Sequence, residues 1–115
     1  MHHMMKSYKV IIPKTVEQDL AEILEYYSAL NPEYALALLN TFKQRFSELK
    51  QLPERGRIVP ELYIYNELRY RELIEQNWRI FYKVQNSEVL VLAVIDSRRN
   101  VQEILLRKLQ RKINL

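Results

Sequence analysis

The chain has 115 residues, of which 48% are hydrophobic and 28% charged, a composition typical of a folded domain with one modest core. It contains no cysteine, which excludes disulfides, thiolate metal sites and cysteine catalysis. It contains one glycine, which excludes the glycine-rich loops that bind nucleotides. No apolar run approaches the roughly 20 residues that cross a bilayer. We therefore expect a cytoplasmic protein, with a single domain over residues 1–115.

The net charge of +4 comes from the C-terminal end of the chain. Residues 98–115 hold six Lys or Arg and one Glu, whereas residues 1–97 hold 12 basic and 13 acidic side chains. The basic end indicates either a solvated last helix whose charge suits its own dipole, or a site that attracts nucleic acid or an acidic protein. At the other end, residues 1–6 are expected to be disordered or vector-derived, so their two histidines do not indicate a metal site.

The first predicted element is a short strand over residues 8–12, which ends at Pro13. Thr15 is predicted to begin a helix, and Gln18 stands where a capping box requires Glu or Gln. Apolar residues then recur at helical spacing as far as Leu30. The sequence therefore predicts a strand followed by an amphipathic helix.

A second helix is predicted to follow almost at once. Asn31 can cap its N-terminus, Pro32 occupies its first position, and apolar residues continue at helical spacing up to Pro53. Two helices joined by so short a connection form an antiparallel hairpin. We expect the apolar stripes of the hairpin to pack on one face of a sheet.

A turn over residues 53–57 contains the single glycine, Gly56, for which we expect a positive φ. Residues 58–68 show no clear pattern, although Pro60 argues against a central strand there. Three strands joined by two-residue turns are then predicted over residues 69–75, 78–85 and 88–96.

The strand over residues 88–96 is apolar on both faces, so we expect it to be the central strand of the sheet. An amphipathic helix from Val101 to Asn114 closes the chain. The predicted fold class is α+β, with an N-terminal strand, an antiparallel helical hairpin packed on a small antiparallel sheet, and a C-terminal helix. The other face of the sheet would be left open for a partner.

Several motifs in a fixed order resemble those of a known family. They are Asp19-Leu-Ala-Glu-Ile23, Tyr26-Tyr27, Leu52-Pro53 with Gly56-Arg57, Arg71-Glu-Leu73, Trp78-Arg-Ile-Phe-Tyr82, Val91 to Ile95, and Ser97-Arg-Arg99. Together they make residues 8–100 resemble the RelE/ParE superfamily of bacterial toxins from type II toxin–antitoxin modules. The pair of motifs that begin at Arg71 and Arg79 is more similar to the ParE, plasmid-stabilisation branch.

The resemblance implies a RelE/ParE-like fold and a cytoplasmic toxin that a cognate antitoxin holds inactive. RelE-like members cleave mRNA in the ribosomal A site. ParE-like members inhibit DNA gyrase and are not known as nucleases. The fold alone does not decide between these activities, so the choice depends on the residues of the site.

Arginines are the candidate functional residues, because an anionic target or a transition-state phosphate requires cations. The candidate target-binding residues are Arg57, Arg71, Arg79, Arg98 and Arg99, and Arg69 is a further available cation. Arg79 is the best of them, since it lies mid-strand beside Phe81 and Lys83 on the face predicted to be open; alternatively, it is an ion-pair partner that positions a helix or loop. Arg98 and Arg99 follow the last strand and alternatively form a solvated turn.

Cleavage of RNA without a metal also needs an acid and a base, and these are harder to find. Family members of both branches commonly carry a histidine near the position of Asp96 to Ser97, and this chain lacks it. Ribosome-dependent members that use lysines carry them on a strand corresponding to residues 70–72, where this chain has the carboxylate of Glu72. Their C-terminal tyrosine would fall near Leu105.

If the protein is an RNase, the candidate catalytic residues are Arg79, Arg99 and Tyr82. Tyr82 is a possible acid, but its alternation with Ile80 favours a place in the core. Glu72 is expected to pair with a neighbouring arginine rather than to act as a base. We find no carboxylate cluster with histidine at metal-ligand spacing, and we expect no cofactor.

We therefore expect a ParE-like toxin that inhibits DNA gyrase by binding, without making or breaking bonds. The alternatives are a RelE-like mRNA interferase that acts on the ribosome and its mRNA, and a degenerate, non-toxic binding module. Either toxin implies an acidic, partly disordered antitoxin whose amphipathic segment wraps the helical hairpin and covers the basic face. A homodimer or a heterotetramer with the antitoxin is the expected assembly.

Overall fold

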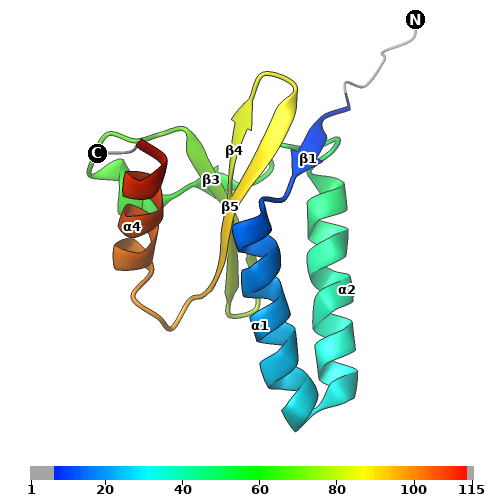
Figure 1. The fold of residues 1–115 in the computed structure, drawn as a ribbon. Coiled ribbons are helices and arrows are strands. Elements are labelled where there is room, and N and C mark those ends of the chain that lie inside the picture. Colours follow the sequence, from blue (N-terminus) through cyan, green and yellow to red (C-terminus); the bar gives the residue numbers. More distant parts are fainter. Residues whose placement is uncertain (1–6, 114–115) are drawn as a thin grey trace, which may run out of the picture.

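The computed structural model describes residues 7–113; the predictions for residues 1–6 and for Asn114 lie outside the described residues. The elements in chain order are β1 (Lys9–Ile11), α1 (Lys14–Leu30), α2 (Pro32–Glu48), β2 (Arg57–Ile58), α3 (Pro60–Tyr63), β3 (Tyr70–Glu75), β4 (Trp78–Gln85), β5 (Glu88–Asp96) and α4 (Val101–Ile113) (Figure 1). Within residues 7–113, no helix combines the length and apolarity needed to cross a membrane. The predicted α+β class is confirmed.

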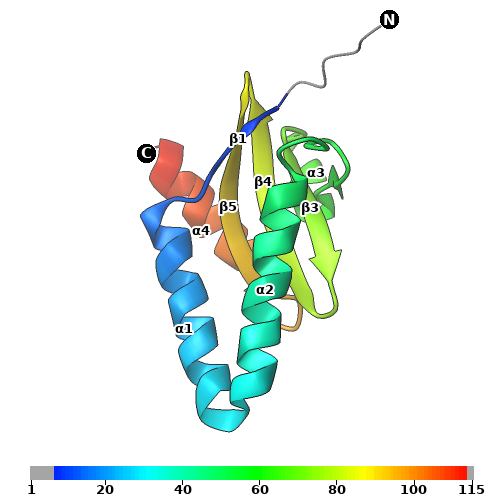
Figure 2. The ribbon, with the colours of Figure 1, turned by 90° about the vertical axis from the view of Figure 1, so that its right-hand side faces the viewer.

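The helical hairpin of α1 and α2 forms as predicted, and the two helices lie side by side against the sheet (Figure 2). The side-chain oxygen of Asn31 accepts a hydrogen bond from the backbone N–H of Tyr34 at 3.1 Å, and Pro32 occupies the first position of α2. The predicted capping box is wrong. Because α1 begins at Lys14, Thr15 lies inside the first turn, and Pro13 occupies the N-cap without any side-chain cap.

The sheet has the strand order β1-β5-β4-β3-β2, with β1 parallel to β5 and the other pairs antiparallel. The middle strand is therefore β4, not β5 as predicted, because β2 adds a short edge strand that the sequence did not reveal. β1 pairs only with the first part of β5, from Glu88 to Leu90. Among the described residues, the outer edge of β5 beyond Leu90 has no strand beside it.

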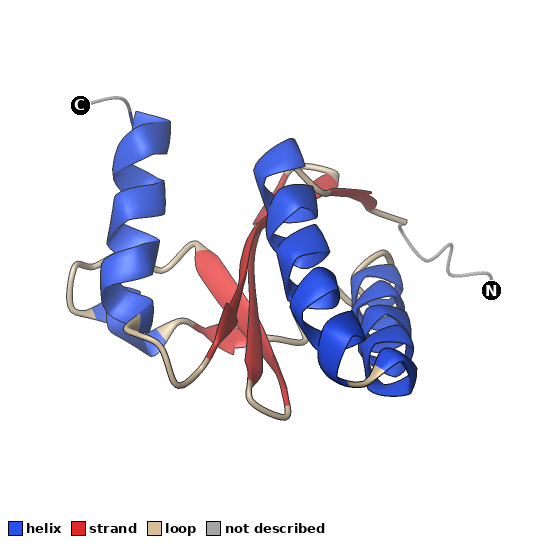
Figure 3. Ribbon diagram, turned by 60° about the horizontal axis from the view of Figure 1, so that its bottom comes forward, coloured by secondary structure: helices blue, strands red, loops and turns tan. Residues whose placement is uncertain are grey.

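Both faces of the sheet are covered by helices, so the prediction of an open face is wrong (Figure 3). On one face, the hairpin buries a core that includes Phe42, Trp78 and Ile80. On the other, α4 and α3 bury a second core, to which α4 contributes Val101 and Leu105. The amphipathic last helix is thus a packed layer of the fold, because burial of its apolar stripe removes that surface from water.

The turn over residues 53–57 differs from what the sequence suggested. Gly56 does not have a positive φ; a Cβ there would lie 2.5 Å from the carbonyl oxygen of Glu72 and 2.6 Å from the hydroxyl of Tyr82. A glycine is needed because of this close approach, not because of the backbone angles. Among the described residues, positive φ values occur instead at Asn66, after α3, and at Gln76 and Asn86 in the two hairpin turns.

Candidate functional site

Arg79 lies on β4, on the face covered by α3 and α4, and only 10% of its side chain is exposed. Its Nη1 and Nη2 donate to the two carboxylate oxygens of Glu61 on α3, at 2.6 and 2.7 Å. Its Nε and Nη2 also donate to the carboxylate of Glu72 on β3, at 2.5 and 3.0 Å. The two terminal nitrogens of Arg79 therefore hold α3 against the sheet, and its Nε joins β4 to β3. An ion pair that positions a helix is the alternative role that the sequence left open.

The carboxylate of Glu72 lies at the centre of this network, and its side chain is completely buried. A second arginine, Arg57 on the neighbouring strand β2, donates its Nε to Glu72 at 2.8 Å. Arg57 and Glu72 are opposed in the β2–β3 register, which places both side chains on the same face of the sheet. The expectation that Glu72 pairs with an arginine is confirmed, with two arginines in place of one.

The charges of the network favour its ionised state. The bidentate hydrogen bonds from Arg79 hold the pKa of Glu61 below its ordinary value. In turn, the carboxylates of Glu61 and Glu72 raise the pKa of Arg79 above its ordinary value. A buried carboxylate with two arginine partners is a structural anchor, since a buried charge is tolerated only when it is paired and hydrogen-bonded.

Tyr82 is buried in the core between the hairpin and the sheet, as the sequence pattern favoured. Its hydroxyl oxygen accepts a hydrogen bond from the backbone N–H of Gly56 at 2.9 Å, and burial raises the pKa of the Tyr82 hydroxyl. Neighbouring Arg71 donates its Nη1 to the carbonyl oxygen of Gly56 at 2.8 Å. Tyr82 and Arg71 thus fix the turn after the hairpin.

The remaining candidate cations lie elsewhere. Arg69 forms an exposed pair with Glu67, two residues earlier, with Nη2 and Oε2 2.7 Å apart. Arg98 forms a similar local pair with Asp96, and this hydrogen bonding holds the pKa of Asp96 below its ordinary value. Arg99 is exposed and lies beside Arg98 in the turn between β5 and α4. The structure therefore does not bring the five candidate arginines together.

A cleft of about 730 Å³ lies between α1, the end of β5 and α4, and it contains Arg98 and Arg99. The apolar and aromatic side chains that line it are Ile23, Tyr26, Tyr27, Trp78, Val94, Ile95 and Ile104. The charged ones are Asp19, Glu22, Asp96, Arg98, Arg99, Arg107 and Lys108. The acidic side chains of α1 thus face a basic rim made by the β5–α4 turn and α4. Such a mixed, partly apolar cleft suits an amphipathic peptide segment.

One ion pair joins the two helical walls of the cleft. Lys108 on α4 donates its Nζ to the carboxylate of Asp19 on α1 at 3.2 Å. At the base of the cleft, the buried indole Nε1 of Trp78 has no hydrogen-bond partner within residues 7–113. In the same part of the chain, no group of three or more His, Cys, Asp or Glu side chains is placed to hold a metal ion.

Sequence reasoning missed two features of the site. It did not find Glu61 as the main partner of Arg79, because residues 58–68 show no helical pattern and α3 has four residues. It also did not find the cleft, which forms beside the end of β5, where α4 on one face of the sheet comes close to α1 on the other. The acidic residue directly after Pro60 was the available signal, since Pro followed by Glu is typical of a first helical turn.

Comparison with solved structures identifies the class of this fold. The chain is similar to a chromosomal ParDE toxin–antitoxin system from P. aeruginosa, with a TM-score of 0.62 and 20% identity over 79% of this chain and 97% of that one. It is also similar to the toxin–antitoxin complex RelBE2 from Mycobacterium tuberculosis, with a TM-score of 0.54 and 21% identity over 83% of this chain and 97% of that one. The architecture is therefore the one shared by RelE/ParE toxins. The comparison with curated proteins gives no match.

The family follows from the sequence itself. The profile of the family described as ParE toxin of type II toxin-antitoxin system, parDE, matches residues 10–101. This range runs from β1 to the first residue of α4 and includes Arg79, Glu72 and the turn with Arg98 and Arg99. The chain belongs to this ParE toxin family, and the predicted resemblance to the RelE/ParE superfamily is confirmed.

Proposed function

We propose that this toxin inhibits DNA gyrase by binding it, and that it does not cleave RNA. The observation that carries the proposal is the position of Arg79 and Tyr82. Every guanidinium nitrogen of Arg79 is engaged by Glu61 and Glu72, and Tyr82 is buried with its hydroxyl on Gly56. An interferase needs a cation and an acid that reach the phosphate, and both candidates serve the fold instead. The match to the ParE family supports the same reading.

A RelE-like, ribosome-dependent interferase is the second candidate. It is favoured by the exposed position of Arg98 and Arg99 at the mouth of a cleft that also contains Tyr26 and Tyr27. Aromatic side chains next to arginines can stack bases and hold phosphates. Asp19, Glu22 and Asp96 in the same cleft oppose this function, because their negative charges repel a phosphate backbone.

We further propose that the partner that silences the toxin is an acidic antitoxin, and that its amphipathic segment occupies the cleft between α1 and α4. The apolar lining provides the burial. The acidic residues of the segment would meet the basic rim of Arg98, Arg99 and Arg107, and its apolar residues would lie on the α1 side, which carries Asp19 and Glu22. The outer edge of β5 beyond Leu90 can also accept backbone hydrogen bonds from an added segment. We propose that the toxin meets both its antitoxin and its target in the cytoplasm.

The test of the main proposal is a supercoiling assay with purified toxin, freed of antitoxin by denaturation and refolding. We expect micromolar toxin to block supercoiling of relaxed plasmid by gyrase, and mRNA in a translation extract to remain uncut. Intact supercoiling would reject gyrase as the target. Codon-spaced cuts in the mRNA would contradict the proposal and favour a ribosome-dependent mRNA interferase. If the protein neither blocks supercoiling nor cuts mRNA, it is better explained as a non-toxic binding module.

The antitoxin proposal is tested by co-expression of the toxin with the product of the neighbouring reading frame. We expect a stable complex in which the cleft side chains, above all Arg99 and Tyr26, become protected from solvent. Hydroxyl-radical footprinting of the complex against the free toxin, which modifies exposed side chains, measures this protection. A failure of the two proteins to co-purify would contradict the proposal.

A further inference from the structure

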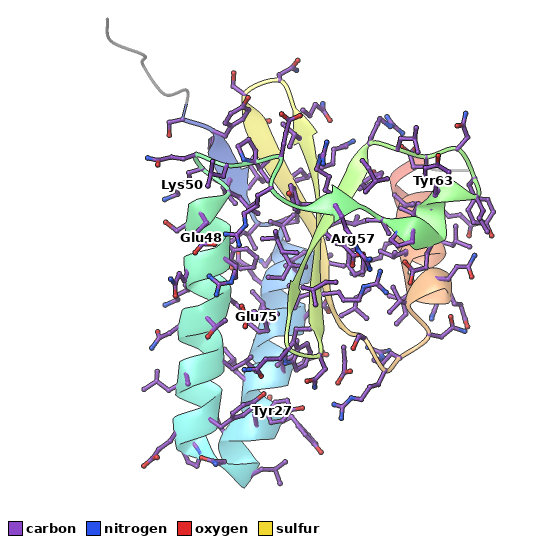
Figure 4. The ribbon with its side chains drawn as sticks, turned by 180° about the vertical axis from the view of Figure 1, so that it is seen from behind. Tyr27, Glu48, Lys50, Arg57, Tyr63 and Glu75 are labelled. Atoms are coloured by element: carbon purple, nitrogen blue, oxygen red, sulfur yellow. The ribbon has the colours of Figure 1, made fainter. Side chains whose placement is uncertain are left out.

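The end of α3 and the segment after it expose four large apolar side chains within six residues. Tyr63, Ile64, Tyr65 and Leu68 are 65, 73, 54 and 47% exposed, and we call them the 63–68 patch. Single exposed apolar residues need no explanation, but a contiguous group indicates an interaction surface. Figure 4 shows Tyr63 at the edge of the molecule that is opposite α2, away from the helical hairpin.

The patch is held in one conformation by several contacts. The buried side chain of Leu62 anchors the segment, and the backbone N–H groups of Tyr65 and Glu67 both donate to the carbonyl oxygen of Leu62 at 3.1 Å. Asn66 adopts a left-handed φ of 58°, which turns the chain back toward β3. Because Glu61 is clamped by Arg79, the start of the segment is fixed to the sheet as well.

This rigidity matters for binding. A side chain that is already ordered loses little conformational entropy when a partner covers it, so pre-organised apolar groups contribute more to affinity than mobile ones. The hydroxyl of Tyr65 also accepts a hydrogen bond from Nε2 of Gln102 on α4 at 3.3 Å. The patch is therefore supported by the sheet, by α3 and by α4.

Two exposed arginines flank the patch. Arg57 is 58% exposed and uses only its Nε on Glu72, and it lies close enough to Glu61 to help lower the pKa of that carboxyl. Arg69 follows Leu68 directly and is 67% exposed. Tyr and Arg are the residues most enriched among those that dominate binding energy at protein interfaces.

We propose that the toxin binds its target protein through the 63–68 patch. The patch would occupy an apolar groove of the target that is rimmed by carboxylates. The proposal rests on the proposed function, in which the toxin acts by binding a large protein. The aliphatic Ile64 and Leu68 fit an apolar groove. Within the described residues Arg57 uses only its Nε, so its two Nη groups can donate to a carboxylate at the rim of that groove, and Arg69 can do so by exchanging its exposed pair with Glu67.

The structure separates this surface from the cleft assigned to the antitoxin. Gln102, which contacts Tyr65, and the cleft residues Ile104 and Lys108 belong to different sides of α4. With four side chains, the patch is smaller than the about 800 Å² that each partner buries in a standard interface, so the target must also contact the side chains around it.

The test compares the double variant Tyr63→Ser/Ile64→Ser with the wild type and with Leu36→Ser. Leu36 is a matched control, because it is an equally exposed apolar residue on α2, remote from the patch. For each protein we measure inhibition of gyrase supercoiling, affinity for the antitoxin, oligomeric state and thermal midpoint. We expect the double variant alone to need at least about tenfold more protein for half-inhibition, with its antitoxin affinity and thermal midpoint unchanged.

A cross-linking experiment does not depend on how well the double variant folds. The chain has no cysteine, so Ile64→Cys carries one unique thiol for a benzophenone label. We expect the label to cross-link to gyrase on illumination, and a label at Leu36→Cys not to do so. Equal cross-linking at both positions would overturn the proposal.

Each of the other possible results also distinguishes the proposal from an alternative. Unchanged inhibition by the double variant would overturn the proposal while the gyrase function stands. Loss of antitoxin affinity would assign the patch to the antitoxin, and conversion of a wild-type dimer to a monomer would assign it to a second copy. A wild type that leaves gyrase untouched would overturn the proposed function and, with it, the target of this surface.

Discussion

Arg79 on β4 and Glu72 on β3 form a buried ion pair in which Nε and Oε1 lie 2.5 Å apart, and the same arginine reaches Glu61 on α3. Arg79, which the sequence favoured as the target-binding residue, thus holds α3 against the sheet. Because the 63–68 patch begins at the end of α3, the ion network also determines how this surface is presented.

Arg79→Met should lower the free energy of unfolding by about 3–5 kcal/mol, because it leaves the buried carboxylate of Glu72 with a single arginine. The double variant Arg79→Met/Glu72→Leu should be more stable than Arg79→Met alone, since it removes the uncompensated charge as well. Urea unfolding of the single and double variants measures both effects. Additive losses would show that the two side chains do not depend on each other.

Tyr82→Phe should destabilise the protein by about 1–3 kcal/mol, because the buried N–H of Gly56 loses its acceptor. It should leave the toxin's effect on growth intact whenever the protein is folded, since Tyr82 has a structural role in this account. Thermal unfolding and growth after induced expression check the two parts. A stable but inactive Tyr82→Phe protein would restore Tyr82 as a catalytic acid.

Acid should weaken the network through Glu61. Pairing with Arg79 lowers the folded-state pKa of Glu61 below its ordinary value of 4.5. Its contribution is therefore fully present above about pH 4.5 and is lost as the pH falls through the folded-state pKa. Glu61→Gln should flatten this part of the curve of unfolding free energy against pH, whereas Glu25→Gln, at an exposed position on α1, should not. Parallel curves for wild type and Glu61→Gln would contradict the assignment.

Arg98→Gln/Arg99→Gln should slow association with an acidic antitoxin by about tenfold at low salt, with a smaller effect at high salt. The reason is the loss of the basic rim of the cleft, while the apolar lining remains. Arg55→Gln/Arg69→Gln removes two exposed charges outside the cleft and serves as the control. Stopped-flow association rates over a salt series measure the effect; equal slowing by the control would assign it to net charge alone.

Much of the fold was accessible from local patterns. The cap at Asn31, the hairpin of α1 and α2 and the three consecutive strands are set by neighbours in the sequence, and all are confirmed. The role of Gly56 was not accessible, because the need for a missing Cβ comes from Glu72 and Tyr82, which lie far away in the chain.

The candidate site was predicted less well, for the same physical reason. Alternation along β4 assigned Tyr82 to the core correctly, but it could not show that α4 covers the face that carries Arg79. The partner of Arg79 on α3 lies in a four-residue helix that has no periodicity to detect. Which residues contact one another across the layers depends on the tertiary structure. These contacts determine whether an arginine is free to bind a partner or stabilises the fold.

The most direct test of the central claim is the order in which macromolecular synthesis fails after the toxin is expressed without its antitoxin. Cells are labelled in parallel with radioactive thymidine and methionine immediately after induction. A toxin that inhibits gyrase by binding predicts that thymidine incorporation falls first, while methionine incorporation continues. A prior or simultaneous stop in methionine incorporation would contradict the account and indicate mRNA cleavage.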